Sequence, residues 1–266
     1  MTTHLAVFLH STGTGPFLWD HVPAEVIGRG KKLAPANLGY APHAPLPRGQ
    51  HISLRDEVAH LVALLPTGPD DPEGDLPLDL YAHSYGATVA IAIARLLRPR
   101  IRSLFLFEPV LFGALARDPQ PDADPGALAE AAHFASNPSF LDDEDQGGGD
   151  AWLAHFIDYW NRPGSWDRMP APMQAYNRAA GWKMFQEVRA CFYDNDRFAD
   201  FTLDPYPNVT LALGERTTAA SREMTRTLAR LSPRARVVEL PRTGHMAPLT
   251  HPALVGEAML AHAQRL

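Results

Sequence analysis

The amino-acid sequence predicts an α/β protein with a mostly parallel, doubly wound sheet and an inserted helical segment. Short apolar runs alternate with amphipathic, helix-like stretches along most of the chain, which favours parallel strands joined by helices. One apolar run turns directly into a helix around Ser84, and the alternation stops after Pro109 and resumes near residue 206. In a sheet of this kind, ligands bind at the carboxyl ends of the strands.

The strands are expected where short apolar runs are bounded by polar residues, Gly or Pro. They are residues 5–10, 31–36, 78–82, 103–107, 208–213 and 235–240. Helices are expected to begin near Trp19 and to span 53–65, 87–97, 219–231 and 252–264. In 53–65, for example, the apolar side chains recur at helical spacing and share one face. Residues 66–77 are rich in Pro, Gly and Asp and predict a surface loop.

Residues 111–205 interrupt the alternation with helices and loops that are rich in large aromatic side chains. We therefore expect an α/β core formed by 1–110 and 206–266, and a helical cap formed by 111–205 that covers the strand ends. Within this segment, the acidic and Gly-rich stretch from Asp142 to Asp150 predicts a mobile loop.

Composition narrows the possible partners and cofactors. The net charge is -6, which argues against a nucleic-acid or anionic membrane partner. The chain has no long apolar run and no basic start, so we expect a cytoplasmic protein without a signal peptide or anchor. Its single cysteine, Cys191, excludes an internal disulfide and a cysteine-rich metal site and is expected to be a buried core thiol. No HExxH or CxxC spacing occurs, so neither a metal nor a cofactor is predicted.

Ser84 is the candidate nucleophile. It lies in Ala82-His83-Ser84-Tyr85-Gly86, a small-x-Ser-x-small pattern between a predicted strand and a predicted helix. This pattern is typical of a nucleophile elbow, whose strained backbone lifts the serine hydroxyl above the sheet edge. Small residues on both sides let strand and helix approach closely. The helix N-terminus then favours negative charge that develops beside the hydroxyl.

A serine nucleophile needs a base, an acid and oxyanion donors. His245 is the candidate base, because it follows the last predicted strand in a Gly-His context and comes after the serine in the chain. His83 is expected to be a supporting residue, and His251 to face solvent or begin a helix. The candidate oxyanion donors are the backbone N–H groups of Tyr85 and of Thr12, which lies in the turn after the first strand.

The chain resembles the α/β-hydrolase superfamily over nearly its whole length, in LAVFLHSTGTG, LYAHSYGA and PRTGHMAPLTHP. Two further stretches, LFLFEPVLFG and FIDYWNRPGSW, resemble a bacterial subgroup with a helical cap. Three departures stand out. His10-Ser11 replaces the usual His-Gly, the N-terminal hairpin is missing because the first strand begins at residue 5, and Thr217 stands where the family commonly has its triad aspartate.

Three positions compete for the acid that orients the histidine. Thr217 cannot carry a charge, and Glu215 could reach only if its loop were reshaped. Glu108 ends a predicted strand next to the Ser84 strand, so its carboxylate should emerge at the same edge as His245. Its apolar surroundings would make an unpaired carboxylate costly, which implies a partner. The resemblance allows an acid after this earlier strand, and we favour Glu108, with Glu215 and a loop-binding role for Glu108 left open.

The sequence therefore predicts a serine hydrolase that cleaves a carboxylic ester through an acyl-enzyme. Thioesters, lactones, acyl transfer and C–C bonds beta to a carbonyl could use the same side chains. A serine at the elbow argues against the aspartate nucleophile of related dehalogenases and epoxide hydrolases. The alternative from another class is a ligand-binding or receptor-like protein without turnover. The expected partner is a small molecule with an apolar part, whereas the particular substrate and the oligomeric state are left open.

Overall fold

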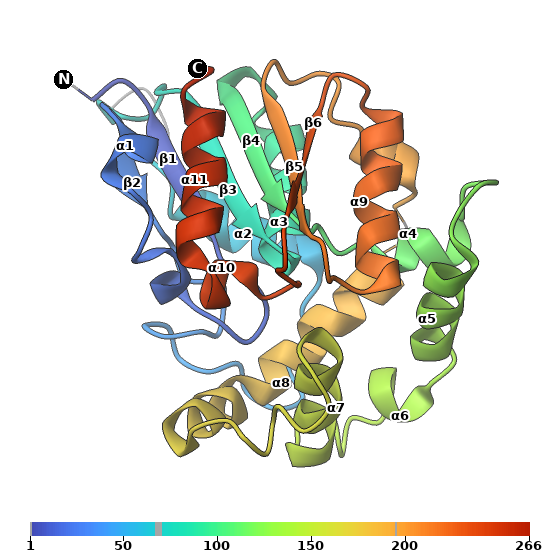
Figure 1. The fold of residues 1–266 in the computed structure, drawn as a ribbon. Helices are drawn as coiled ribbons and strands as arrows, with labels where there is room; N and C mark the ends of the chain where they lie inside the picture. The colour runs from blue at the N-terminus through green and yellow to red at the C-terminus, as the bar shows by residue number, and fades with distance from the viewer. Residues whose placement is uncertain (1, 67–70, 195) are drawn as a thin grey trace.

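The computed structural model describes residues 2–66, 71–194 and 196–266, and its centre is a parallel sheet (Figure 1). Six strands are described, in the order β2-β1-β3-β4-β5-β6, and every neighbouring pair is parallel. The strands are β1 (Leu5–Leu9), β2 (Lys31–Leu33), β3 (Leu78–His83), β4 (Ile101–Phe107), β5 (Val209–Gly214) and β6 (Arg236–Leu240). The predicted fold class is therefore confirmed, and the chain order of the strands brings β3, β4 and β5 to the middle of the sheet.

Helices cover both faces of the sheet. They are α1 (Ala24–Ile27), α2 (Leu54–Ala63), α3 (Tyr85–Leu96), α9 (Ala219–Leu231), α10 (Ala247–Thr250) and α11 (Pro252–Ala263). Alternate residues of a strand point to opposite faces. Accordingly, Leu5, Val7 and Leu9 of β1 join a core with α2, α3 and α9, whereas Ala6 and Phe8 join a second core with α1 and α11. Burial on both faces explains why the sequences of the inner strands β1, β3, β4 and β5 are nearly continuous apolar runs.

Residues 112–201 form a helical segment beyond the carboxyl ends of the strands (Figure 1). Its helices are α4 (Phe112–Arg117), α5 (Pro125–Ala135), α6 (Pro138–Leu141), α7 (Asp150–Trp160), α8 (Ala171–Tyr193) and a 3-10 helix, Phe198–Phe201. Many aromatic side chains of this segment pack on one another, as Phe112 does on Phe192 and Phe140 does on Trp152. The division of the chain into a core domain and a cap domain stays a prediction.

Two local predictions differ from the structure, and a third lies partly outside the described residues. The helix expected near Trp19 is a 3-10 helix, Pro16–Trp19, and α1 begins only after Pro23. The residue before a proline is disfavoured in helical conformation, which separates the two short helices. The second strand ends at Leu33 rather than residue 36, and the Pro35 that follows has no N–H to donate to a neighbouring strand. Part of the predicted surface loop 66–77, residues 67–70, lies outside the described residues.

The stretch expected to be a mobile loop, 142–150, is instead packed against helix α8. Gly147 and Gly148 are buried. A side chain on Gly148 would lie 2.2 Å from the backbone of Gly181, and one on Gly147 would lie 2.6 Å from the ring of Phe185. These two glycines therefore allow close packing against α8. The prediction of a mobile loop is wrong because composition alone does not distinguish glycines that permit close packing from glycines that make a loop flexible.

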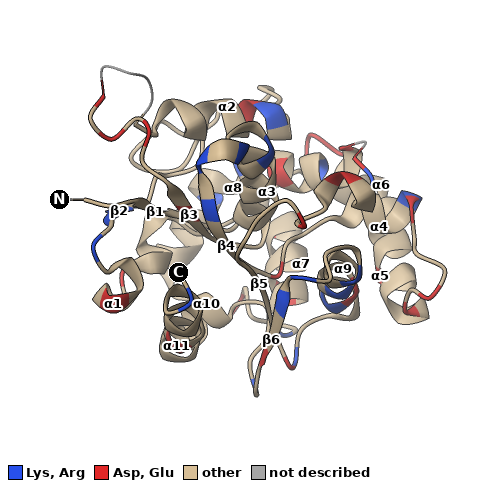
Figure 2. Cartoon of the chain, turned by 90° about the horizontal axis from the view of Figure 1, so that it is seen from above, with Lys and Arg blue, Asp and Glu red and all other residues tan. Residues whose placement is uncertain are grey.

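Acidic and basic side chains are interspersed on the outside of the molecule. Figure 2 shows both basic and acidic residues on α2 and on α9. On α9, Arg222 pairs with Glu239 and Arg230 pairs with Glu223. Within the described ranges, no helix combines the length and the apolar character that crossing a membrane would need.

Two buried histidines are expected to make the fold sensitive to acid. Burial lowers the pKa of His10 and of His262 from 6.5 to about 4. Above pH 6.5 both histidines are neutral in the folded and unfolded chain, so they do not affect stability. As the pH falls from 6.5 towards 4, only the unfolded chain binds their protons, and stability is lost. At pH 5 the loss is on the order of 2 kcal/mol for each histidine.

Urea denaturation at pH 7.5 and pH 5.0 checks this prediction, with His262→Gln as the informative variant. The Nδ1 atom of His262 lies 2.9 Å from the hydroxyl of Thr210, a contact that a glutamine side chain could keep. We expect the free energy of unfolding of the variant to fall less between the two pH values than that of the wild type. Equal losses in both proteins would show that His262 does not contribute to the acid sensitivity.

Candidate active site

The turn between β3 and α3 holds Ser84 in a strained conformation. Ser84 has φ 57° and ψ -122°, and residues other than glycine rarely adopt a positive φ. Its N–H donates a hydrogen bond to the carbonyl of Phe107, 2.9 Å away at the end of β4. Because both the strand before it and the helix after it are packed into the core, this conformation is imposed on Ser84 by its neighbours.

Gly86 explains why the elbow needs a small residue at this position. A Cβ atom here would lie 2.4 Å from the carbonyl oxygen of His10 and 2.7 Å from that of Leu9. Both are backbone atoms at the end of β1, so they cannot turn aside as a flexible side chain would. The glycine lets the first turn of α3 lie directly on the adjacent strand end.

Gly86→Ala is therefore expected to destabilise the protein by about 1–3 kcal/mol, the range for overpacking a closely packed site. Gly126→Ala is the matched control, because Gly126 is likewise the second residue of its helix, α5. The nearest atom to a Cβ there is the side-chain oxygen of Asp124, at 3.0 Å. Urea denaturation should show little loss in the control. Similar curves for the two variants would contradict the close approach at Gly86.

Hydrogen bonds link Ser84 to His245 and His245 to Glu108. The Oγ atom of Ser84 is 2.9 Å from Nε2 of His245, and Nδ1 of the same imidazole is 2.6 Å from Oε2 of Glu108. The three residues follow β3, β6 and β4, whose carboxyl ends share one edge of the sheet. All three side chains are buried. The structure thus brings together the predicted nucleophile, base and acid, in the arrangement that lets a histidine accept a serine proton.

Glu108 is held by several donors. Its Oε1 accepts the N–H of Gly214 at 2.7 Å, and its Oε2 accepts the hydroxyls of Thr217 at 2.6 Å and Ser221 at 2.8 Å besides its contact with His245. Burial would raise the pKa of Glu108, but the hydrogen bonds from His245, Gly214 and Thr217 outweigh it and lower the pKa below its ordinary value. The carboxylate is therefore kept charged beside the imidazole.

The other two positions considered for the acid, Thr217 and Glu215, make other hydrogen bonds. Thr217, at the position where the resemblance leads one to expect an acid, donates its hydroxyl to Glu108. Glu215 is exposed and accepts the N–H of Arg242 through Oε2 at 2.5 Å, and no contact joins it to His245 among the described residues. His251 is exposed and precedes α11.

Two further side chains, those of His83 and Trp160, contact His245. Of the two, only His83 was predicted from the sequence as a supporting residue. His83 Nε2 donates to the backbone carbonyl of His245 at 2.8 Å. Burial, and then the neighbouring His245, keep the pKa of His83 well below its ordinary value, so it stays neutral. Trp160, the last residue of α7, stacks on the imidazole of His245 with ring centroids 3.7 Å apart. No local pattern in the sequence distinguishes Trp160 from the other aromatic residues of its segment.

The candidate oxyanion donors belong to two different elements, the turn after β1 and the first residue of α3. Thr12 is in the turn Ser11–Thr14, closed by a hydrogen bond from Thr14 N–H to the carbonyl of Ser11 at 3.2 Å. Tyr85 is the first residue of α3, so its N–H has no acceptor within the helix. Within the described part of the chain, neither N–H is hydrogen-bonded to another residue. Both donors are thus free to bind a ligand oxygen.

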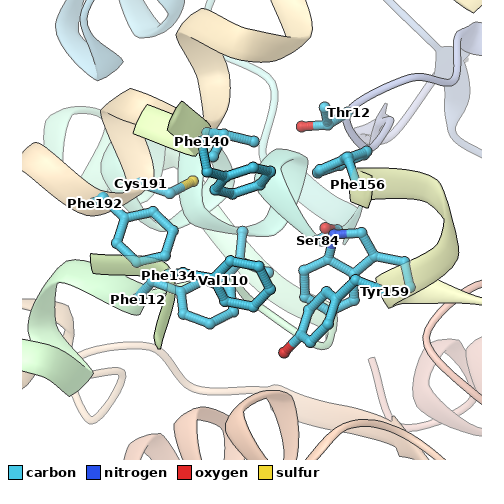
Figure 3. Close-up of a pocket in the computed structure, with 12 residues that line it drawn as sticks. Thr12, Ser84, Val110, Phe112, Phe134, Phe140, Phe156, Tyr159, Cys191 and Phe192 are labelled. Atoms are coloured by element: carbon cyan, nitrogen blue, oxygen red, sulfur yellow. The ribbon is translucent and has the colours of Figure 1, made fainter. Parts of the chain in front are cut away.

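An aromatic cavity opens beside Ser84, and its empty space, including the part that is open to solvent, is about 410 Å³ (Figure 3). Apart from Thr12 and Ser84, its lining is apolar or aromatic: Val110, Phe112, Phe134, Phe140, Phe156, Tyr159, Trp160, Val188, Cys191 and Phe192. Cys191 was predicted as a buried core thiol, and it lines this cavity instead. Burial raises the pKa of its thiol, which keeps it protonated and unreactive.

A second cavity of about 610 Å³ meets the first at Ser84. The two share Thr12, Ser84, Phe156 and Trp160. The second cavity is lined by His245 and by a mixture of methionine and polar side chains, which include Met169, Met173, Met184, Met246, Asn161 and Asn177. The serine hydroxyl therefore lies where a chamber with an aromatic wall joins a larger and more polar one. Among the described residues, no cluster of His, Cys, Asp and Glu is arranged to hold a metal ion.

Three features define the class of the protein: a parallel sheet, a serine at a strand-to-helix elbow, and a histidine after the last strand that contacts both this serine and a buried carboxylate. The chain belongs to the α/β-hydrolase family: the sequence profile described as "Alpha/beta hydrolase family" matches residues 6–258. A search of curated protein sequences finds no match.

Solved structures share the fold at low sequence identity. A hydrolase from Pseudomonas aeruginosa PA01 is 18% identical, with a TM-score of 0.66, and the match covers 98% of this chain and 89% of that one. MGS-M2, an α/β hydrolase from a Medee basin deep-sea metagenome library, is 13% identical with a TM-score of 0.72, covering 98% and 90%. A thermophilic esterase from Thermogutta terrifontis is 16% identical with a TM-score of 0.64, covering 99% and 90%. At such identities the likeness extends to the fold alone.

Proposed function

We propose that this α/β hydrolase is a serine esterase that cleaves a carboxylic ester through an acyl-enzyme. The observation that carries the proposal is the continuous series of contacts from Ser84 Oγ to His245 Nε2, at 2.9 Å, and from His245 Nδ1 to Glu108 Oε2, at 2.6 Å. A hydroxyl is a weak nucleophile unless a base takes its proton, and this arrangement supplies both the base and the acid that orients it.

The reaction follows from the position of each group. Ser84 Oγ attacks the ester carbonyl carbon while its proton passes to His245 Nε2. The carbonyl oxygen becomes an oxyanion, which in this proposal accepts hydrogen bonds from the N–H groups of Thr12 and Tyr85, and the Glu108 carboxylate stabilises the imidazolium. His245 then donates the proton to the departing alcohol. Water, deprotonated by His245, attacks the acyl-enzyme and releases the carboxylic acid and the Ser84 hydroxyl.

The two cavities support a substrate with an apolar part. The cavity beside Phe112 and Phe134 has no charged side chain in its lining, so a charged group would lose its hydration there without gaining a partner. We infer that an aromatic or branched aliphatic part of the substrate enters this cavity, while the part across the scissile bond extends towards Asn161 and Asn177. The expected partner is therefore a small neutral ester, and the cytoplasmic location stays a prediction.

Other reactions are compatible with the same side chains. An acyltransferase would use an alcohol or amine in place of water, and a C–C hydrolase would cleave a bond beta to a carbonyl. A ligand-binding protein without turnover would keep the cavities and dispense with the chemistry. We place ester hydrolysis first because the aromatic cavity, the free N–H donors and the serine–histidine contact together meet the requirements of that reaction.

A panel of p-nitrophenyl esters tests the proposal, with acyl groups that are short, long, aromatic or charged. We expect the purified protein to hydrolyse the aromatic and branched acyl esters with the highest kcat/KM, and the charged acyl ester with the lowest. Adding an alcohol acceptor to the same assay distinguishes transfer from hydrolysis by its product. A folded protein that binds these esters and turns over none of them would favour the ligand-binding alternative and contradict the esterase proposal.

A further inference from the structure

Helix α8 contacts the turn that carries Thr12 at two points. The hydroxyl of Tyr176, on α8, donates a hydrogen bond to the carbonyl of Thr14 at 2.8 Å. Closer to Thr12, the N–H of Gly13, the next residue in the chain, donates to the hydroxyl of Tyr40 at 2.9 Å. Tyr40 in turn donates to Oε2 of Glu187, again on α8, at 2.9 Å. The two residues that follow Thr12 are thus hydrogen-bonded, directly or through one residue, to the same helix.

The second contact ends in a cluster of buried charges. Lys183 of α8 donates to Oε1 of Glu187 at 2.6 Å and also contacts Oε2 of Glu57 on α2. The side chains of Lys183, Glu57 and Glu187 are all fully buried. The other oxygen of Glu57 accepts the N–H of Leu38 at 2.7 Å. The cluster therefore ties α8 to the core of the fold and presents one carboxylate oxygen of Glu187 to Tyr40.

The hydrogen bonds that lead from Gly13 through Tyr40 to Glu187 run in one direction, and Lys183 donates to the same carboxylate from its other side. Gly13 N–H donates to Tyr40, Tyr40 donates to Glu187, and Glu187 accepts from Lys183. Burial, and then the nearby Glu187, raise the pKa of Tyr40 well above its ordinary value, so the hydroxyl keeps the proton that it donates. Hydrogen bonds arranged head to tail in a buried site reinforce one another. The hydroxyl of Tyr40 is therefore fixed in orientation at both its donor and its acceptor side.

Close packing accompanies these hydrogen bonds. Gly13 has φ +72°, and a Cβ atom at this residue would lie 2.8 Å from the end of Met184 and 3.0 Å from the side-chain oxygen of Asn177. Both Met184 and Asn177 belong to α8. The helix therefore touches the turn as well as hydrogen-bonding to it, and the positive φ of Gly13 favours glycine at this position.

We propose that helix α8 positions the oxyanion-binding N–H of Thr12, and that Tyr40 is the residue that transmits its position from Glu187 to the turn. This inference rests on the proposed function, in which that N–H binds the oxyanion. Tyr40 acts as a positioning residue, because it touches the backbone next to Thr12 and not the substrate. A shift of the N–H would weaken binding of the oxyanion, which exists only in the transition state, and would leave the bound ester largely unaffected.

The test compares Tyr40→Phe with Tyr193→Phe. Tyr193 lies on α8 and, like Tyr40, donates to a carboxylate, that of Asp142 at 2.6 Å, but on an exposed surface away from the turn. For hydrolysis of the best p-nitrophenyl ester, we expect Tyr40→Phe to lower kcat by about tenfold with KM changed less than about twofold. This is less than the loss of about 10²–10³-fold that follows removal of a whole oxyanion donor. Tyr193→Phe should leave both constants unchanged.

Inhibition by phenylboronic acid separates positioning from general destabilisation. Its adduct with Ser84 would place a boron-bound oxygen where the oxyanion forms, so its inhibition constant should rise by the factor by which kcat falls in Tyr40→Phe. Tyr176→Phe, which removes the contact with Thr14, should show the same pairing with a smaller change. The inference is overturned if kcat of Tyr40→Phe stays within twofold of wild type, if Tyr193→Phe loses as much, or if kcat falls while phenylboronic acid binds unchanged. Absence of turnover in the wild type itself would overturn the proposed function, and this inference with it.

Discussion

Ser84→Ala is expected to lower kcat for ester hydrolysis by about 10⁴–10⁶-fold, the range typical of nucleophile removal in serine hydrolases. The physical reason is that Ser84 Oγ supplies the electron pair that forms the acyl-enzyme, and no other hydroxyl lies in contact with His245 Nε2 among the described residues. His245→Ala should cause a similar loss, because the members of such a group act as a unit. Steady-state kinetics with the best ester of the panel measures both effects.

The fold should survive both substitutions. Ser84 is nearly buried, and its side chain makes a single hydrogen bond, to His245. Alanine is also small enough to adopt the turn, so circular dichroism and thermal melting should resemble those of the wild type. A variant that keeps more than about a tenth of the wild-type rate would show that its residue has been assigned the wrong role.

Glu108→Gln is expected to lower kcat by at least about a hundredfold with the fold intact, because an amide cannot stabilise the imidazolium that forms on His245. The carboxylate is surrounded by donors: the N–H of Gly214, the hydroxyls of Thr217 and Ser221, and Nδ1 of His245. A glutamine would turn its own NH₂ towards one of these donors, so the imidazole would also lose a defined orientation.

Glu215→Gln is the matched control for this prediction. Glu215 directly follows β5, and its carboxylate accepts the N–H of Arg242 on the exposed side of the loop. We expect kcat to change by less than about tenfold in this variant, since Glu215 does not contact His245. The reverse ranking would move the acid to Glu215. Mild effects from both variants would mean that the serine and histidine work without a carboxylate.

The sequence allowed the elements around Ser84 and His245 to be predicted because their positions follow from local patterns. A buried strand that passes into a helix predicts the elbow, and a histidine after the last strand must lie at the same sheet edge. Glu108 could be favoured over Glu215 by a similar argument, since a carboxylate in LFLFEPVLF needs a buried partner. In the structure, Thr217 donates a hydrogen bond to Glu108. The residue at the usual position of the acid therefore supports the carboxylate of Glu108.

The rest of the candidate site depends on long-range packing that no local pattern contains. Trp160 reaches His245 because helix α7 ends above the strand edge, and its sequence neighbours are equally aromatic. Tyr40 lies in a Pro- and Gly-rich stretch without periodicity, and its partner Glu187 is 147 residues away. Gly147 and Gly148 resemble a flexible loop in composition and are packed against α8. In each case the contact is made by two segments that meet only in the folded chain.

Labelling with a fluorophosphonate probe tests the central claim most directly, because the probe forms a covalent bond only with a serine whose hydroxyl is activated as a nucleophile. Peptide mass spectrometry of the purified wild-type protein should locate one adduct, on Ser84, and the same adduct should be absent from Ser84→Ala and form far more slowly in His245→Ala. A folded wild-type protein that acquires no adduct, or an adduct that persists in Ser84→Ala, would contradict the assignment of Ser84 as a nucleophile activated by His245 and Glu108.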